Sequence, residues 1–283
     1  PMHSDDLGEF VLNPPCRSFG HTLRKGEEVL LQWEYPQGSL PIPIASFLIG
    51  FREPSRSQAE EFSDATALAA KSDVAIVFVG TTAEIESEGH DRKDISLPDG
   101  QDQLVSAVAK VAKRTIVVVN AGSPVEMPWF DEVDSVLFTY FGGQQMGSAL
   151  ADVIYGVVNP AARTPTTWAT QLSDLPVVNT TPTNGELDYS EGRFIGYRAW
   201  IKSNRVPLIP FGHGLSYTTF TSELLSADKS TAKVKVVNTG KRFGAEVVQL
   251  YATSSDAQLF ERRLVGFAKV ELKPGESATV DIA

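Results

Sequence analysis

Uninterrupted runs of β-branched and other apolar residues constrain the fold more than any other feature of this sequence. "DVAIVFVG" occupies residues 73–80, and "RTIVVVNAG" occupies residues 114–122. Neither run alternates polar with apolar side chains, which is the pattern of a strand buried on both faces of a parallel sheet. "SVLFTYFGG", residues 135–143, indicates a third strand. The sequence therefore predicts a mainly parallel sheet in the middle of the chain.

Segments with helical periodicity precede and follow these strands: residues 55–73, 97–113 and 144–156. The first has a plausible N-cap at Ser55 or Ser57. In the second, apolar residues recur at i, i+4 and i+7, namely Leu104, Val108 and Val111. Strands and helices that alternate with short links form α/β layers around a parallel sheet. We therefore expect an α/β sandwich domain over residues 53–172.

The flanking segments have the patterns of β-structure. Residues 1–52 are rich in proline and contain "EEVLLQWEYP" and "IPIASFLIGF", which read as the last strands of a β-domain. Residues 173–222 are a connector rich in Pro and Gly. Residues 223–283 alternate with period two between Asn-Thr-Gly and Lys-Pro-Gly turns, which predicts an immunoglobulin-like sandwich. About five strands fit there, fewer than the usual ~7.

Composition narrows the possible partners. The 283 residues suffice for two ordinary domains. The chain carries 25 basic and 35 acidic side chains, a net charge of −10, which disfavours nucleic acid and anionic membranes. No apolar stretch approaches the ~20 residues of a membrane span. Cys16 is the one cysteine, so no internal disulfide forms, and both a secreted and a cytoplasmic location stay open.

The stretch "EIESEGHDR", residues 84–92, follows directly after the first buried strand. Ligands of parallel sheets bind beyond the carboxyl ends of the strands. An extended backbone would place Glu84, Glu86 and Glu88 on one face, where like charges raise one another's pKa. A carboxyl with a raised pKa can act as a general acid. Because acidic loops are also commonly just solvated, the pattern alone leaves both interpretations open.

Other chemistries lack their motifs. His90 and His213 do not have metal-ligand spacing. The chain contains neither of the glycine-rich nucleotide-binding motifs, and Ser87 and Ser123 have no G-x-S-x-G elbow around them. The sequence therefore predicts no metal and no cofactor.

Five motifs in order carry a resemblance to a known family: "ESEGHDRKDISLPDGQDQLVSAVA", "TIVVVNAGSPVEMPW", "GSALADVIYGVVNPAARTP", "YSEGRFIGYRAW" and "PLIPFGHGLSYTTF". Together they resemble the C-terminal half of glycoside hydrolase family 3, β-glucosidase type, closely over residues 54–222 and less closely over 223–283. The resemblance implies an α/β sandwich domain that supplies an acid/base carboxylate, followed by part of a fibronectin type III-like domain. It also implies that residues 1–52 end an inserted domain of the protective-antigen type.

The resemblance also assigns residue roles. The family's acid/base glutamate lies in the segment that matches "SEG", which corresponds to Glu88, with Glu86 as the runner-up because short acidic loops align ambiguously. Asp91 and Arg92 match the family's "DR" and are expected to shape the loop. "NPAARTPTTW" departs from the usual Ser-Gly-Arg/Lys-Leu-Pro pattern without touching the expected acid.

The implied reaction is retaining hydrolysis that removes terminal β-D-glucosyl residues from a β-glucoside or oligosaccharide. In the family, the nucleophile is an aspartate on a TIM-type barrel, and no such barrel lies within residues 1–283. We therefore expect the isolated chain to supply half of a site and to be inactive alone.

Two other functions stay open. A non-catalytic carbohydrate-binding module would stack sugars on exposed Trp129, Trp168 and Trp200, although large aromatics are usually buried. A phosphate-binding α/β protein is opposed by the acidic charge and the missing phosphate motifs.

Overall fold

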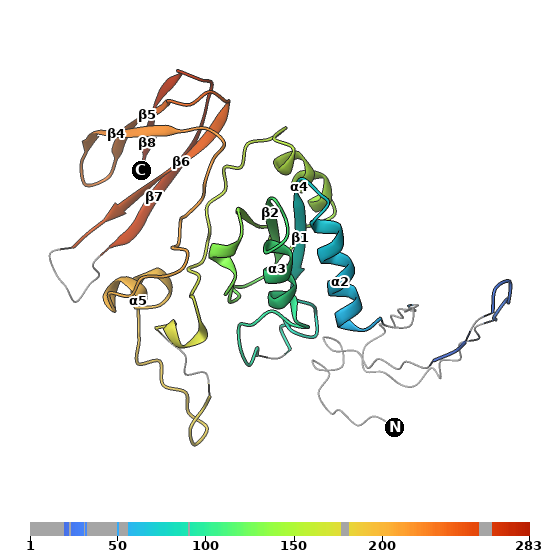
Figure 1. The fold of residues 1–283 in the computed structure, drawn as a ribbon. Coiled ribbons are helices and arrows are strands. Elements are labelled where there is room, and N and C mark those ends of the chain that lie inside the picture. The colour runs from blue at the N-terminus through green and yellow to red at the C-terminus, as the bar shows by residue number, and fades with distance from the viewer. Residues whose placement is uncertain are drawn as a thin grey trace.

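A computed structural model describes residues 20–22, 24–30, 32, 50, 56–89, 91–176, 181–254 and 262–283. Its α/β part alternates helices and strands in chain order: α2 (Gln58–Ala69), β1 (Ala75–Gly80), α3 (Gln101–Ala109), β2 (Thr115–Asn120), the 3₁₀ turn η1 (Phe130–Glu132), β3 (Ser135–Phe138) and α4 (Met146–Ile154). In Figure 1 the three helices lie around these strands.

The sheet has the order β1-β2-β3 and is parallel throughout, which confirms the expected fold class. Its core faces α3: Val77 of β1 is in register with Val117 of β2, and both pack with Val105 and Val108. Parallel alignment brings the carboxyl ends of β1 and β2 to one edge of the sheet. The loops that follow these two strands therefore start side by side.

The two apolar runs differ in burial. β2 is buried as expected, because β1 and β3 flank it on either side. The expectation of burial on both faces is wrong for β1: Ile76 is 40% exposed and Phe78 is 61% exposed, whereas Val77 and Val79 are buried. β1 is an edge strand among the described residues, and only its face toward α3 is fully covered.

The start of α2 agrees with the cap predicted from the sequence, whereas the end of α3 differs from the prediction. α2 begins with Ser57 as N-cap in a capping box: the Glu60 N–H donates to Ser57 Oγ (3.3 Å), and the Ser57 N–H donates to Glu60 Oε2 (3.0 Å). The apolar stripe expected on α3 is partly wrong. The helix ends at Ala109, so Val111 lies beyond it and is 43% exposed, and the buried face consists of Val105 and Val108.

The connector contains the 3₁₀ turn η2 (Leu172–Asp174) and α5 (Gly196–Lys202). It leaves and rejoins the α/β part at one place, where the Trp168 N–H donates to the Ile209 carbonyl (2.8 Å). Gly212 then fastens this segment to the sandwich, because its carbonyl accepts from Gln249 Nε2 (2.8 Å). Gly212 has a φ of +80°, a backbone conformation that favours glycine, and a Cβ there would also lie 2.1 Å from Gln249 Oε1.

The sandwich consists of five antiparallel strands in two sheets, β4-β5-β8 and β6-β7, as the alternating pattern predicts. Their bounds are β4 (Phe220–Ala227), β5 (Ala232–Asn238), β6 (Gly244–Ala252), β7 (Arg263–Leu272) and β8 (Ser277–Ile282). The inner faces form a small core of Val234, Val236, Val248, Leu272 and Ile282.

Arg163 joins the end of the α/β part to the sandwich. Its Nη2 donates to both carboxylate oxygens of Glu246 (2.7 and 2.8 Å), with side chains only 13% and 20% exposed. Its Nη1 donates to the Gly214 carbonyl (3.0 Å), so one guanidinium holds three parts of the chain together.

The strands expected within residues 1–52 fall almost wholly outside the described residues, and residues 27–30 show no strand pairing. The inserted domain therefore stays a prediction. Among the described helices, none is long and apolar enough to cross a membrane.

Candidate active site

The acidic loop leaves the carboxyl end of β1, next to the loop that leaves β2. Its backbone turns instead of extending, because the N–H groups of Ile85 and Glu86 both donate to the Thr82 carbonyl (2.9 Å each). The expectation that the three glutamates share one face of an extended strand is therefore wrong. Glu84 and Glu88 are exposed, whereas the Glu86 side chain is 11% exposed.

Glu86 bridges the two strand-end loops. Its Oε2 accepts from the Gly122 N–H (3.0 Å) and from the Thr81 hydroxyl, and its Oε1 accepts from the Ser123 hydroxyl. Arg92 Nη1 lies 3.7 Å from Oε1. Thr81 follows β1 directly, while Gly122 and Ser123 follow β2, so a single carboxylate ties both strand ends together.

The pKa of Glu86 lies below its ordinary value. Burial is the largest single influence and raises the pKa, but the hydrogen bonds from Ser123, Thr81 and Gly122, together with the Arg92 charge, outweigh it. The expectation that clustered carboxylates raise one another's pKa is thus wrong for Glu86. A carboxylate held ionised by three donors is a poor proton donor at neutral pH.

Glu88 has a different environment two residues further on. Its side chain is exposed, and the described residues give its carboxylate no hydrogen-bond or ion-pair partner. The next turn is local: the Gly89 N–H donates to Ser87 Oγ (3.1 Å). Among the glutamates of this loop, Glu88 therefore has an exposed carboxylate that is available to a molecule from outside, and Asp91 is exposed as well.

Arg92 closes the loop onto the neighbouring segment. Its Nη1 donates to Ser123 Oγ (2.8 Å) and to the Pro124 carbonyl (3.3 Å), and its side chain is 14% exposed. These contacts support the loop-shaping role expected of Arg92. Asp91 is exposed and its role stays a prediction, and His90 lies outside the described residues.

Sequence reasoning missed the hydroxyl donors of this network. Thr81 and Ser123 follow the ends of parallel neighbouring strands, by one and by three residues. A hydroxyl side chain within three residues after a strand at this edge is the signal that could have indicated them.

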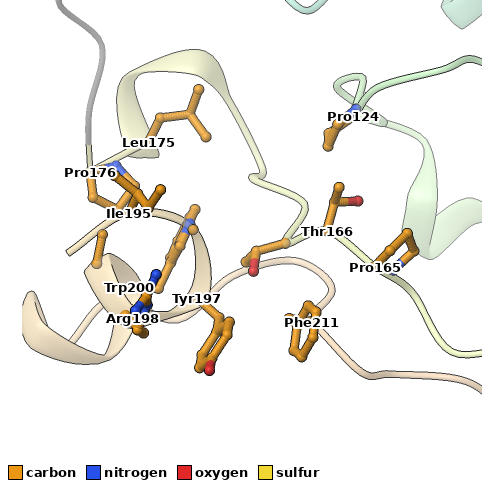
Figure 2. Close-up of a pocket in the computed structure, with 13 residues that line it drawn as sticks. Pro124, Pro165, Thr166, Leu175, Pro176, Ile195, Tyr197, Arg198, Trp200 and Phe211 are labelled. Atoms are coloured by element: carbon orange, nitrogen blue, oxygen red, sulfur yellow. The ribbon is translucent and has the colours of Figure 1, made fainter. Parts of the chain in front are cut away.

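A cavity of about 480 Å³ lies beside this network, between the connector, α5 and the loop after β2. Figure 2 shows Pro124 and Thr166 on one side, Trp200 and Arg198 on the other, and Tyr197 and Phe211 beneath them. The lining is mostly apolar, but three buried polar atoms have no partner within the described residues: Thr166 Oγ1, Thr167 Oγ1 and Arg198 Nε. Pro124 joins this cavity to the network through Ser123.

The three tryptophans in the described part of the chain do not form a sugar-binding surface. Trp129 and Trp168 are fully buried, and Trp200 is 4% exposed. Trp129 Nε1 donates to Asp102 Oδ1 (2.7 Å), and Trp168 packs against Phe138 with ring centroids 4.3 Å apart. The exposed-tryptophan basis for a carbohydrate-binding module is therefore wrong. No cluster of three or more His, Cys, Asp or Glu side chains suited to a metal occurs in the described residues.

Comparison with protein families matches residues 15–217 to the glycosyl hydrolase family 3 C-terminal domain and residues 246–283 to a fibronectin type III-like domain. The first match includes most of the segment assigned above to an insert. The second covers β6 to β8, within the five-stranded sandwich.

Curated relatives with similar sequences are β-glucosidases. The probable beta-glucosidase I of Emericella nidulans is 43% identical over 242 residues, covering 80% of this chain and 29% of that protein. The thermostable beta-glucosidase B of Acetivibrio thermocellus is 46% identical over 232 residues, covering 78% and 31%. This chain thus spans less than a third of the length of these relatives.

Solved structures give the same result. The Kluyveromyces marxianus beta-glucosidase in complex with glucose aligns with a TM-score of 0.77 at 38% identity, over 81% of this chain and 29% of that one. The Streptomyces venezuelae beta-glucosidase DesR, in complex with D-glucose, aligns with a TM-score of 0.74 at 37% identity. By sequence and by fold, the chain belongs to glycosyl hydrolase family 3 and contains its C-terminal α/β domain together with fibronectin type III-like strands.

Proposed function

We propose that this chain supplies the general acid/base, Glu88, to a retaining β-glucosidase whose nucleophile comes from a barrel domain outside residues 1–283. The single observation that carries the proposal is the contrast within the acidic loop. Glu86 is anchored by three donors and kept ionised, while Glu88 is exposed and unpartnered beside the same strand ends. The β-glucosidase relatives supply the reaction class.

The reaction has two steps. First, the barrel carboxylate attacks the anomeric carbon and the bond to the leaving oxygen breaks, while the Glu88 carboxyl gives its proton to that oxygen. Then Glu88, now a carboxylate, takes a proton from water, whose oxygen attacks the anomeric carbon and releases the sugar from the nucleophile. Retention requires the two carboxyls to lie about 5–5.5 Å apart.

The division of the site predicts inactivity of the isolated chain. A general acid alone contributes only ~10²–10⁴-fold, and the nucleophile is not among residues 1–283. We also propose the domain boundaries expected from the sequence: 1–52 for the end of an insert, 53–172 for the α/β domain, 173–222 for the connector and 223–283 for the fibronectin type III-like part.

Replacement of Glu88 in the full-length enzyme tests the proposal. Glu88→Ala should lower kcat/KM for cellobiose and alkyl glucosides by ~10²–10⁴-fold. A dinitrophenyl glucoside needs no protonation of its leaving group, so its first step should be nearly unaffected. Azide should restore turnover because this anion attacks the anomeric carbon without needing a base, displaces the nucleophile carboxylate and yields a β-glucosyl azide.

Glu61→Ala, on the exposed side of α2, is the matched control and should behave like the unsubstituted enzyme. If Glu88→Ala lowers turnover of all substrates equally, or no more than Ser87→Ala does, the assignment of Glu88 is wrong.

A further inference from the structure

We infer that Glu86 and Ser123 are positioning residues that fix Glu88 by locking the loop after β1 to the loop after β2. This inference rests on the proposed role of Glu88. It assigns to Glu86 a task other than proton transfer, and it gives Ser123 a role that the family resemblance did not suggest.

Several segments of the chain meet at Glu86. Hydrogen-bond donors reach its carboxylate from the end of β1 (Thr81) and from the segment after β2 (Gly122 and Ser123). The Arg92 guanidinium, at the end of the loop, forms an ion pair with it at 3.7 Å. Arg92 also bonds Ser123 Oγ (2.8 Å), so hydroxyl, carboxylate and guanidinium form a closed triangle. Both ends of the loop are therefore fixed to β2.

Only one residue separates Glu86 from Glu88, so the chain between them is short. Two residues of fully extended chain span at most ~7 Å, so a fixed Glu86 backbone confines the Glu88 backbone to that radius. Glu88 itself has no partner in the described residues that would hold it. The position of its carboxyl therefore depends on its neighbour.

Gly122 fits closely between Phe141 and Glu86. A Cβ at this position would lie 2.6 Å from Phe141 Cε2 and 3.3 Å from Glu86 Oε1. A side chain at this position would have to displace the Phe141 ring, so glycine gives the backbone N–H an unobstructed approach to the carboxylate. The site is thus built so that an N–H group, which cannot rotate away, points at Glu86 Oε2 (3.0 Å).

The position of the Glu88 carboxyl determines the rate of acid catalysis. A general acid must come within about 2.6–3.2 Å of the oxygen that it protonates. Misplacement by ~1 Å can cost ~10²-fold in rate. Loosening of the loop should therefore weaken acid catalysis while it leaves the sugar-binding contacts of the barrel unchanged.

The experiment uses the full-length enzyme with Glu86→Gln and Ser123→Ala. The Gln amide has the size of Glu, but it replaces one acceptor oxygen by an NH₂ group and removes the negative charge opposite Arg92. The network must therefore reverse a hydroxyl hydrogen bond or lose one. Ser123→Ala removes one hydroxyl and leaves Glu86 intact. Glu61→Gln and Ser63→Ala, both exposed on α2, make the same chemical changes elsewhere.

The measurement is kcat/KM across aryl and alkyl β-glucosides of increasing leaving-group pKa. We expect both variants to lose ~10- to 100-fold on the poorest leaving groups and little on dinitrophenyl glucoside, with KM nearly constant. A residue with a merely structural role would lower the rates of all substrates together. Thermal unfolding of each variant verifies folding, and if Glu86→Gln fails to fold, Ser123→Ala decides.

The same series with Glu88→Ala separates the two proposals. If Glu88→Ala shows no dependence on the leaving group, the proposed function fails. If Glu88→Ala does depend on the leaving group, while Glu86→Gln and Ser123→Ala match their controls, then only the positioning inference fails. If azide rescues a Glu86→Ala enzyme but not Glu88→Ala, then Glu86 is itself the acid/base and both assignments are overturned.

Discussion

At the scale of single residues, two glutamates separated by one serine have opposite environments. Family resemblance pointed to Glu88 ahead of Glu86, and the geometry supplies a reason for that order. The charge pattern alone could not, because the difference comes from Gly122 and Ser123, more than thirty residues away along the chain. Local sequence records the three carboxylates but not the donors that the neighbouring strand brings to one of them.

The lowered pKa of Glu86 makes stability depend on pH. Because its folded-state pKa lies below the unfolded value of 4.5, Glu86 stabilises the fold above about pH 4.5, and this stabilisation is lost as the pH falls through the folded pKa. Glu86→Gln should cost about 1–3 kcal/mol at pH 7, since it leaves buried donors unpaired. Urea unfolding at pH 7 and pH 3.5 would measure the unfolding free energies of the unsubstituted 283-residue chain and of Glu86→Gln. The difference between the two free energies should be smaller at pH 3.5 than at pH 7. An equal difference at both pH values would contradict the prediction.

Asp102 should show the opposite trend. Burial raises its pKa, the bond from Trp129 Nε1 lowers it, and the nearby Glu126 charge raises it, with a net rise. The folded state therefore holds this proton more tightly than the unfolded chain, so Asp102 contributes less stability as the pH rises through its folded pKa. Asp102→Asn keeps an oxygen for Trp129 and removes the charge. At pH 7 the unfolding free energy of this variant should equal or exceed that of the unsubstituted chain. At pH 3.5 the variant should no longer be the more stable of the two.

At the scale of elements, the sequence was most informative where one face is buried. The order of strands and helices from α2 to α4 and the sandwich from β4 to β8 follow the predicted order. The errors occur where tertiary neighbours decide burial. β1 and β2 have similar apolar runs, yet only β2 has a strand on each side. Val111 fits the helical period, but α3 ends before it.

The start of α2 gives a test at this scale. Ser57→Ala removes the side-chain acceptor for the Glu60 N–H and breaks the reciprocal bond of the capping box. The loss should be about 1 kcal/mol. Ser63→Ala lies in the exposed middle of the same helix and should be neutral or slightly stabilising, because Ala is the better helix former. Chemical denaturation of both variants checks the difference, and equal effects would argue against the cap.

At the scale of the whole molecule, the α/β part and the sandwich are held together by a few specific polar contacts. Arg163 and Glu246 are the most buried ion pair of this junction. Arg163→Ala would leave Glu246 without its partner and should destabilise the junction by about 3 kcal/mol. Lys233→Ala breaks the exposed pair with Asp281 and should cost less than about 1 kcal/mol. Calorimetry would show the first variant, but not the second, melting at a clearly lower temperature.

The strand bridge between Trp168 and Ile209 has a consequence for covalent continuity. The chain leaves this bridge after Trp168, passes through η2 and α5, and returns to the bridge at Ile209. The bridge therefore holds together the two ends of the segment 169–208. A peptide bond cut at the turn around Asn184 and Gly185 would separate the polypeptide into two pieces. Those pieces should still elute together from a sizing column, and part only when the nicked protein is dissolved in detergent.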